Sequence, residues 1–189
     1  MSPKYTLTYT EIPGFLSQIQ LSEHYKLYEG YYNQTQTIPA LINGISQTPA
    51  VSNVRGMQKT LQYALSGREL HELYFASMKT EAGGIDDVSA GFKTLVETSF
   101  GSWDVFVADL KAIAKTCRGW YRLELDPKNR VLYHNVGDFH DEGSTAGFAL
   151  VAALDMYDHA YFFDYQTNKG EYIEQWLKHL DWAMISARI

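Results

Sequence analysis

The sequence predicts an α+β fold, in which an N-terminal long helical hairpin is followed by a C-terminal domain of helices around a three-stranded antiparallel sheet. Two stretches in the first half of the chain carry apolar and aromatic residues at helical spacing. In the second half, two β-forming segments flank a turn-rich tetrapeptide, and an apolar segment follows them. We therefore divide the chain into two domains, residues 1–85 and residues 86–189.

The first predicted helix follows an irregular N-terminal arm. Two prolines and a glycine discourage regular structure over residues 1–18. Residues 21–35 are predicted to form a helix, because His24, Tyr28 and Tyr32 recur every four residues and share one face.

The second predicted helix covers residues 57–76, after a connection over residues 36–55 that contains two prolines and a glycine. Its buried side is predicted to comprise Leu61, Ala64, Leu65, His71 and Phe75. Gly67 interrupts this helix at a cost of about 1 kcal/mol relative to alanine, which suggests that close packing requires a glycine there.

The C-terminal domain is predicted to begin after EAGGIDD (81–87). Ser102 is a suitable N-cap for an amphipathic helix that continues through about Thr116. A final helix is predicted over residues 171–189. The strands of the domain are predicted at residues 119–126 and 129–136, joined through the turn DPKN, and at the apolar run 147–155.

Composition excludes several classes of function. The net charge is −6 and no basic run is present, so binding to nucleic acid, which depends on clustered Lys and Arg, is not expected. No segment is long and apolar enough to span a membrane. Cys117 is the only cysteine, which excludes an internal disulfide and favours a cytoplasmic location.

Asp155 and His159 are the first candidate metal ligands. They stand four positions apart, directly after the apolar third strand, so both are expected at the edge of a core. A carboxylate and an imidazole at this spacing can hold one iron, manganese or zinc ion, although an i,i+4 surface contact is the competing interpretation. His24 and His71, each among large apolar residues, would complete a shell of three nitrogens and one oxygen.

Three blocks of the sequence carry family motifs. DMYDHAYFFDYQTNKGEYIEQWLKHLDW (155–182) is similar to D-x-W-E-H-A-Y-Y followed by D-Y-Q-N and a helix ending in N-W. Residues 100–125 contain a helix followed by Gly-Trp at the start of a strand. The patterns H-x-x-x-H-x-x-x-Y and N-H-x-x-F-W correspond to the helices around His24 and His71. Over nearly its whole length, the chain therefore resembles the iron/manganese superoxide dismutase family.

This resemblance implies one iron or manganese ion per chain, held between the two domains. The implied metal ligands are His24, His71, Asp155 and His159. A solvent molecule would be the fifth ligand, and an open position would accept superoxide, a small anionic substrate. Tyr32 corresponds to the family's gateway tyrosine, which makes it a predicted catalytic residue. The residues implied to line the pocket are Tyr28, Trp120 and Tyr157.

The glutamine that many family members place beside the metal-bound solvent is missing. Gly67 occupies the position four before His71, and residues 131–147 contain no glutamine. His140 corresponds to a subgroup that uses histidine instead, so it is the second predicted catalytic residue. His134 is the next candidate, and the alternative is that His140 only caps the turn DFHDEG.

The resemblance also implies a homodimer or a dimer-based tetramer. Asp158 stands where the family has a glutamate that reaches a metal-binding histidine of the other subunit, so it is the predicted interface bridge. Asp is one methylene shorter than Glu, and Phe162 replaces the tyrosine that usually lies at this interface.

The leading hypothesis is dismutation of superoxide to dioxygen and hydrogen peroxide at a mononuclear iron or manganese site. The alternative is a metal-binding relative with a structural or sensing role, because Tyr28, Asp158 and Phe162 depart from the family pattern. A third possibility is a different metal-dependent oxidation. Iron and manganese are not distinguished, because both accept the same ligands.

Overall fold

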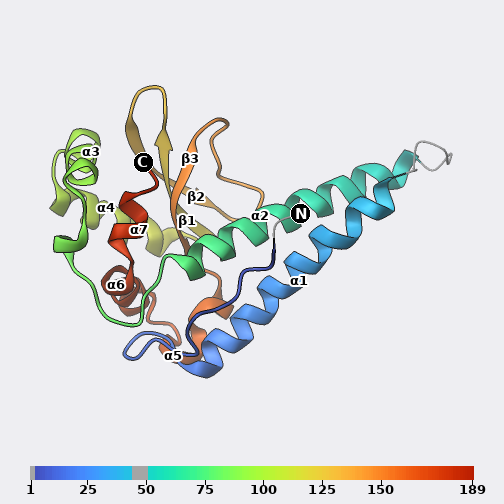
Figure 1. Cartoon of the computed structure of the whole chain (residues 1–189), viewed down its shortest axis with the longest axis horizontal. Coiled ribbons are helices and arrows are strands. Elements are labelled where there is room, and N and C mark those ends of the chain that lie inside the picture. The colour runs from blue at the N-terminus through green and yellow to red at the C-terminus, as the bar shows by residue number, and fades with distance from the viewer. Residues whose placement is uncertain (1–2, 44–50) are drawn as a thin grey trace.

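A computed structural model describes residues 3–43 and 51–189, and its fold is the predicted α+β arrangement. A pair of long helices projects from one side of the molecule, and helices around a three-stranded sheet form the rest (Figure 1). The short elements of the chain are η2 (Ile85–Asp87), η3 (Asp158–Ala160) and α5 (Phe162–Tyr165).

Helix α1 (Gln18–Ile42) is longer than predicted at both ends. It begins after Ser17, whose hydroxyl accepts a hydrogen bond from the backbone N–H of Gln20 at 3.2 Å. Pro39 lies within the last turn, where the missing N–H removes a single backbone bond, so the helix continues through it.

The predicted connection over residues 36–55 is therefore wrong at both ends. Residues 36–42 belong to α1, and residues 51–55 belong to helix α2 (Val51–Ala76). The remaining part, with Gly44 and Pro49, lies outside the described residues.

Helix α2 returns alongside α1 and buries one face (Figure 1). Ala64, His71 and Phe75 are buried as predicted, but Leu65 is 37% exposed, so its assignment to the buried side is wrong. The predicted close packing at Gly67 is confirmed: a Cβ there would lie 3.1 Å from atoms of both Tyr31 and His140. The face set by Ala64, Gly67 and His71 follows the i, i+3, i+7 spacing of a helix.

The three predicted strands are confirmed as one antiparallel sheet in the order β2-β1-β3. These strands are β1 (Trp120–Asp126), β2 (Val131–Gly137) and β3 (Ala149–Asp155). Strand β1 lies in the centre of the sheet, and every residue in it is buried. Its first residue, Trp120, pairs directly with Asp155 at the end of β3.

Helix α3 (Ala90–Phe100) was not predicted from the sequence. Its signals are present, because Ser89 accepts a hydrogen bond from the N–H of Phe92 and Gly101 ends the helix at a positive φ of 88°. Helix α4 (Trp103–Thr116) has the predicted bounds, and the predicted cap Ser102 accepts from the N–H of Val105 at 3.2 Å.

The single C-terminal helix predicted over residues 171–189 is wrong, because two helices are present. Helix α6 (Lys169–His179) and helix α7 (Trp182–Ser186) are separated where the chain pairs with the segment after α2. The N–H of Asp181 donates to the carbonyl of Ser77 at 2.7 Å, and Met78 and Leu180 form a β-bridge. These tertiary hydrogen bonds replace the helical ones at the break.

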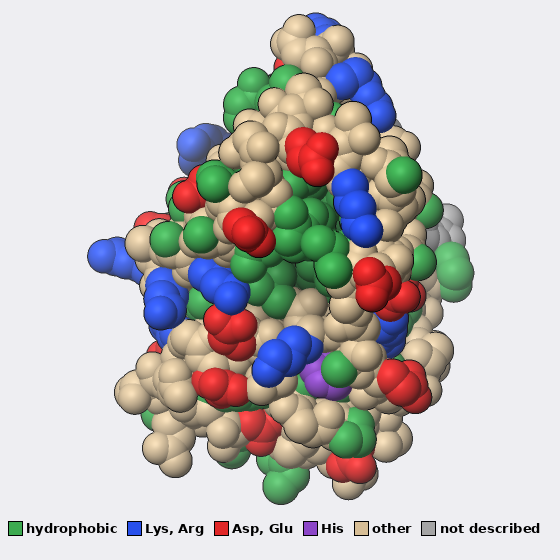
Figure 2. Space-filling model, turned by 90° about the vertical axis from the view of Figure 1, so that its left-hand side faces the viewer, with side chains coloured by type: hydrophobic (Ala, Val, Ile, Leu, Met, Phe, Trp, Pro, Cys, Tyr) green, Lys and Arg blue, Asp and Glu red, His purple; other side chains and the backbone are tan. Residues whose placement is uncertain are grey.

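The face that carries α3, α4 and α6 has hydrophobic side chains in a central hollow, with Lys, Arg, Asp and Glu around it (Figure 2). A shallow pocket on this side is lined mainly by Trp103, Val107, Leu177 and Trp182. Among residues 3–43 and 51–189, no helix has the length and hydrophobicity needed to cross a membrane.

Candidate metal centre

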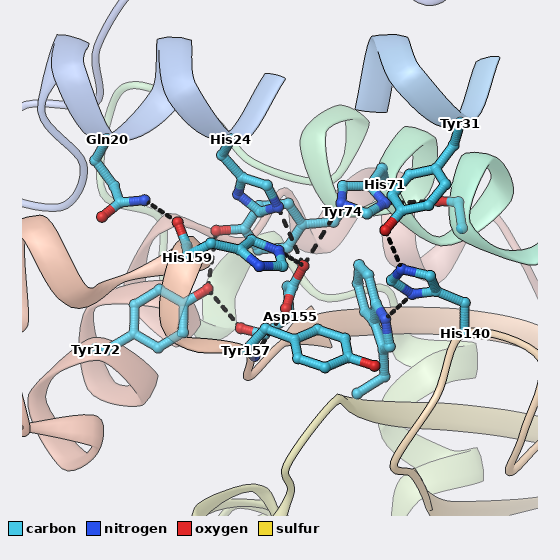
Figure 3. Close-up of polar contacts among 12 residues, drawn as sticks. Gln20, His24, Tyr31, His71, Tyr74, His140, Asp155, Tyr157, His159 and Tyr172 are labelled. Atoms are coloured by element: carbon cyan, nitrogen blue, oxygen red, sulfur yellow. Dashed lines mark hydrogen bonds and ion pairs between the residues drawn. The ribbon is translucent and has the colours of Figure 1, made fainter. Parts of the chain in front are cut away.

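Four side chains from four elements of the fold meet at one point (Figure 3). His24 comes from α1, His71 from α2, Asp155 from the end of β3 and His159 from η3. One ligand atom from each residue lies within 4.8 Å of all the others. The sequence pair Asp155 and His159 is therefore no surface contact, since Asp155 is completely buried.

The geometry fits a metal ion. The Oδ2 atom of Asp155 lies 3.1 Å from Nε2 of His24, 3.3 Å from Nε2 of His159 and 3.6 Å from Nε2 of His71. Ligand atoms placed about 2.0–2.2 Å from one ion stand about 3–4 Å apart, which is the spacing seen. The Nε2 atoms of His71 and His159 are also buried without any hydrogen-bond partner, which is unfavourable unless a ligand contacts them.

Hydrogen bonds orient the candidate ligands. Nδ1–H of His71 donates to the carbonyl of Gly67 at 2.6 Å, so the lone pair of its Nε2 is directed to the cluster. Oδ1 of Asp155 accepts from the N–H of Tyr157 at 2.9 Å, which leaves Oδ2 for the cluster. Gln20, which the sequence did not indicate, donates from Nε2 to the carbonyl of His159 at 2.5 Å.

The protonation states also suit a metal. Burial lowers the pKa of His71 to about 3, with a further contribution from His24, and burial likewise lowers the pKa of His24. Burial alone would raise the pKa of Asp155, but the charge of nearby His159 and the hydrogen bond with His24 hold it well below its usual range. Burial disfavours the charged form of His159, yet Asp155 raises its pKa. His24 and His71 are thus held neutral beside an ionised carboxylate, as metal binding requires, and a bound metal would displace the proton that Asp155 favours on His159.

His140 lies beside this cluster, with its ring 5.6 Å from that of His71. The indole N–H of Trp120 donates to its Nδ1 at 2.7 Å, and its Nε2 bonds the hydroxyl of Tyr31 at 2.8 Å. Because the indole can only donate, Nδ1 is unprotonated and the neutral ring carries its proton on Nε2. Burial lowers the pKa of His140 to about 4, so the ring stays neutral.

The tyrosine that hydrogen-bonds His140 is Tyr31, whereas the sequence indicated Tyr32 as the tyrosine of the pocket. The ring of Tyr31 lies 5.4 Å from that of His71 and 4.7 Å from that of His140. Tyr32 packs its ring 6.4 Å from that of Tyr28. Tyr31 is seven positions after His24, two full helical turns, so helical periodicity carried a signal that motif alignment did not.

The other predicted pocket residues occupy different surroundings. Tyr157 stacks on the ring of His159 at 5.3 Å, and Trp120 lies 5.1 Å from the ring of His71. Tyr28 is buried, but its hydroxyl donates to Glu72 and accepts from the backbone N–H of Tyr5, so it ties the N-terminal arm to both long helices.

Three further residues bear on the sequence interpretation. Tyr63, which the sequence did not single out, places its ring 4.6 Å from that of His140. His134, the second candidate for the role of His140, is half-buried on β2, stacks on the ring of Phe106 and hydrogen-bonds the hydroxyl of Tyr121. Asp158 is exposed and accepts a hydrogen bond from the hydroxyl of Tyr161 at 2.8 Å.

We expect the metal-free protein to lose stability as the pH falls from 7 to about 4.5. Unfolded histidines, with a pKa of about 6.5, take up protons in this window, whereas folded His71 and His140, with pKa values of about 3 and about 4, do not. The unfolded state then binds more protons, so the free energy of unfolding falls, by about 1 kcal/mol or more. Urea denaturation at both pH values measures this change.

The raised pKa of His159 opposes the effect in part, and the variant His140→Gln should show a smaller change between the two pH values. Equal or greater stability of the unmodified metal-free chain at pH 4.5 would contradict the prediction.

Comparison with known proteins identifies relatives of the chain. The family described as "Iron/manganese superoxide dismutases, C-terminal domain" matches residues 88–188. "Superoxide dismutase [Fe]" from Aquifex pyrophilus is 32% identical over 168 residues, which cover 87% of this chain and 78% of the relative. "Superoxide dismutase [Mn] 1" from Halobacterium salinarum is 28% identical over 170 residues, 90% of this chain and 84% of the relative.

A third relative, "Superoxide dismutase [Mn/Fe]" from Aeropyrum pernix, is 24% identical over 179 residues, 94% of this chain and 84% of the relative. Of the three relatives, one is thus named with iron, one with manganese and one with both metals. The family match covers more than half of the chain, and the first relative extends across the helical pair as well. The chain belongs to the iron/manganese superoxide dismutase family.

Proposed function

We propose that this protein dismutates superoxide to dioxygen and hydrogen peroxide at one iron or manganese ion per chain. The observation that carries the proposal is the convergence of three imidazole Nε2 atoms on Oδ2 of Asp155. Relatives named superoxide dismutase, 25–32% identical over most of the chain, support it. They also disfavour the alternative of a structural or sensing protein.

His24, His71, Asp155 and His159 would hold the ion. A bound iron or manganese would supply a one-electron couple that accepts an electron from one superoxide and returns it to the next. Three neutral imidazoles and one carboxylate leave a trivalent ion with a formal charge of about +2, which attracts a small anion. Solvent has little access to the candidate metal centre, because His24, His71 and Asp155 are completely buried.

His140 and Tyr31 would supply protons for peroxide formation. Nε2–H of His140 donates to the hydroxyl oxygen of Tyr31, so the Tyr31 O–H can donate to another partner, either neighbouring Tyr63 or an anion in the pocket. Burial raises the pKa of Tyr31, with a contribution from Tyr63, so the hydroxyl keeps its proton at neutral pH. On this geometry, Tyr31 takes the gateway role that the motif alignment gave to Tyr32.

The metal-loaded protein is expected to remove superoxide, and the metal-free protein is not. The measurements are elemental analysis and superoxide decay for the iron form and the manganese form separately. Asp155→Asn should lower metal content and activity together, because it removes the only anionic ligand. His134→Gln, which alters a half-buried histidine outside the cluster, should leave metal content unchanged. Stoichiometric metal without superoxide decay would overturn the proposal.

Replacement of Tyr31 by Phe should lower kcat by about tenfold or more, because it removes the hydroxyl that bonds His140. Tyr32→Phe, one residue further along α1, is the matched control and should change kcat little. Rapid-mixing measurements of superoxide decay on both metal-loaded variants test this. The reverse result would assign the gateway role to Tyr32.

We also propose a homodimer, with Asp158 at its interface. Phe162 and Phe163, on α5 directly after the candidate ligand His159, are 50% and 66% exposed, which is unusual for adjacent phenylalanines on a lone chain. Sedimentation equilibrium should give about twice the mass of one chain, and a single-chain mass would exclude this interface. The cytoplasmic location remains a prediction that cell fractionation tests.

A further inference from the structure

Arg122 is a buried cation in the middle of the sheet. Its side chain is completely buried on β1, and no carboxylate of the described residues lies within 4.0 Å of its guanidinium. Glu124 and Asp141 favour its charge only through space, and burial lowers its pKa. Burial of a charge without a partner ion costs free energy. We therefore expect the hydrogen bonds of Arg122 to have a role in the structure.

Those contacts all go to the segment between β2 and β3, residues 138–148, which we call the His140 loop. Nη2–H of Arg122 donates to the carbonyl of His140 at 2.8 Å, and more weakly to the carbonyl of Phe139 at 3.4 Å. Nη1–H donates to the hydroxyl of Ser144 at 3.4 Å. The guanidinium thus bonds the backbone of the residue whose ring lies beside the metal centre.

Two glycines make room for the guanidinium. A Cβ on Gly137 would lie 3.1 Å from Nη1 of Arg122, and a Cβ on Gly143 would lie 2.8 Å from it. Gly143 also has a φ of +82°, which side-chain-bearing residues rarely adopt. The nearest atom to each added Cβ is a backbone carbonyl oxygen, of Glu142 for Gly137 and of Val136 for Gly143, so the two glycines let β2, the His140 loop and the Arg122 side chain pack closely together.

Strand β1 hydrogen-bonds His140 at two points, its ring and its backbone carbonyl. Trp120 and Arg122 are two positions apart and so share one face of the strand. Trp120 donates to Nδ1 of the His140 ring, while Arg122 donates to the His140 carbonyl. Trp120 is also the strand partner of Asp155, so one strand sets the position of His140 relative to a candidate metal ligand.

We propose that Arg122 is a positioning residue for His140. By holding the His140 loop from inside the sheet, it keeps the imidazole between Trp120 and Tyr31 and beside His71. Arg122 itself contacts none of the four candidate ligands in the hydrogen bonds and ion pairs of the described chain. The inference concerns the proposed site, but its first test needs neither metal nor dismutation.

The first test follows the Trp120 indole N–H in the metal-free protein by proton–nitrogen NMR. The chain has four tryptophans, so Trp120→Phe assigns its signal by removing it. Arg122→Met, which keeps most of the volume but no charge or donor, should shift this signal in the same direction as His140→Ala. The control is Glu124→Ala: Glu124 is also buried on β1 and bonds the same loop, through the N–H of Thr145 at 3.1 Å, but it does not touch His140. The control should leave the signal in place.

The second test uses azide, a small anion, with the iron-loaded protein. Arg122→Met should change the azide Kd and the visible spectrum in the same direction as His140→Ala, by about fivefold or more in Kd. If Arg122 acts through His140, adding Arg122→Met to His140→Ala should produce no further change. Additive effects in this double-mutant cycle would overturn the proposal, since they would mean that Arg122 acts on the site independently.

Stability is measured alongside by urea denaturation. Arg122→Met removes an unpaired buried charge, so it should still fold. Arg122→Lys keeps the charge without the two-pronged donor geometry, and it should also shift the Trp120 signal, which keeps the test open if the methionine variant fails to fold. A folded Arg122→Met or Arg122→Lys variant with an unmoved Trp120 signal refutes the positioning role, whether or not the protein proves to be a dismutase.

Discussion

The need to keep Asp155 ionised inside the protein constrains the rest of the structure. Its carboxylate is completely buried, and burial by itself would favour the protonated form. His159 and His24 beside one of its oxygens reverse that preference, and the other oxygen accepts a hydrogen bond from the N–H of Tyr157. These contacts, with that of His71 at the first oxygen, join residues of α1, α2 and η3 to the end of β3, so both long helices must pack accurately against that strand end.

Strand β1 is the element that makes this accuracy possible. It lies between the other two strands, is buried along its whole length, and pairs Trp120 with Asp155. On the same face, Trp120 and Arg122 reach the ring and the backbone of His140. Strand β1 thus positions both Asp155, a candidate metal ligand, and His140, rather than leaving each to a separate loop.

The surroundings of the candidate ligands differ from the family pattern in a coordinated way. The absence of a side chain at Gly67 leaves the space that His140 and Tyr31 occupy, each within 3.1 Å of where a Cβ would be. The carbonyl of the same glycine orients His71. Tyr28, where the family has a second helix histidine, bonds Glu72 and the N-terminal arm instead. A side chain at position 67 would therefore displace the ring of His140 or of Tyr31.

The sequence by itself determined the fold class, the three strands, the cap at Ser102 and the need for a glycine at position 67. These features depend on local periodicity, turn chemistry and short-range sterics. It also nominated all four residues of the cluster, because their motifs are compact. Helix ends were less well predicted, since α1 continues through Pro39 and tertiary hydrogen bonds divide α6 from α7.

Only the tertiary structure decided which of two adjacent tyrosines faces His140, and what the buried Arg122 contacts. Tyr31 and His140 are 109 positions apart in the chain, and Arg122 on β1 hydrogen-bonds His140 in the loop between β2 and β3. Neighbouring residues on a helix differ by about 100° in direction, so the rotation of α1 about its own axis decides whether Tyr31 or Tyr32 faces His140. That rotation is set by packing among distant segments, and no local sequence pattern specifies it.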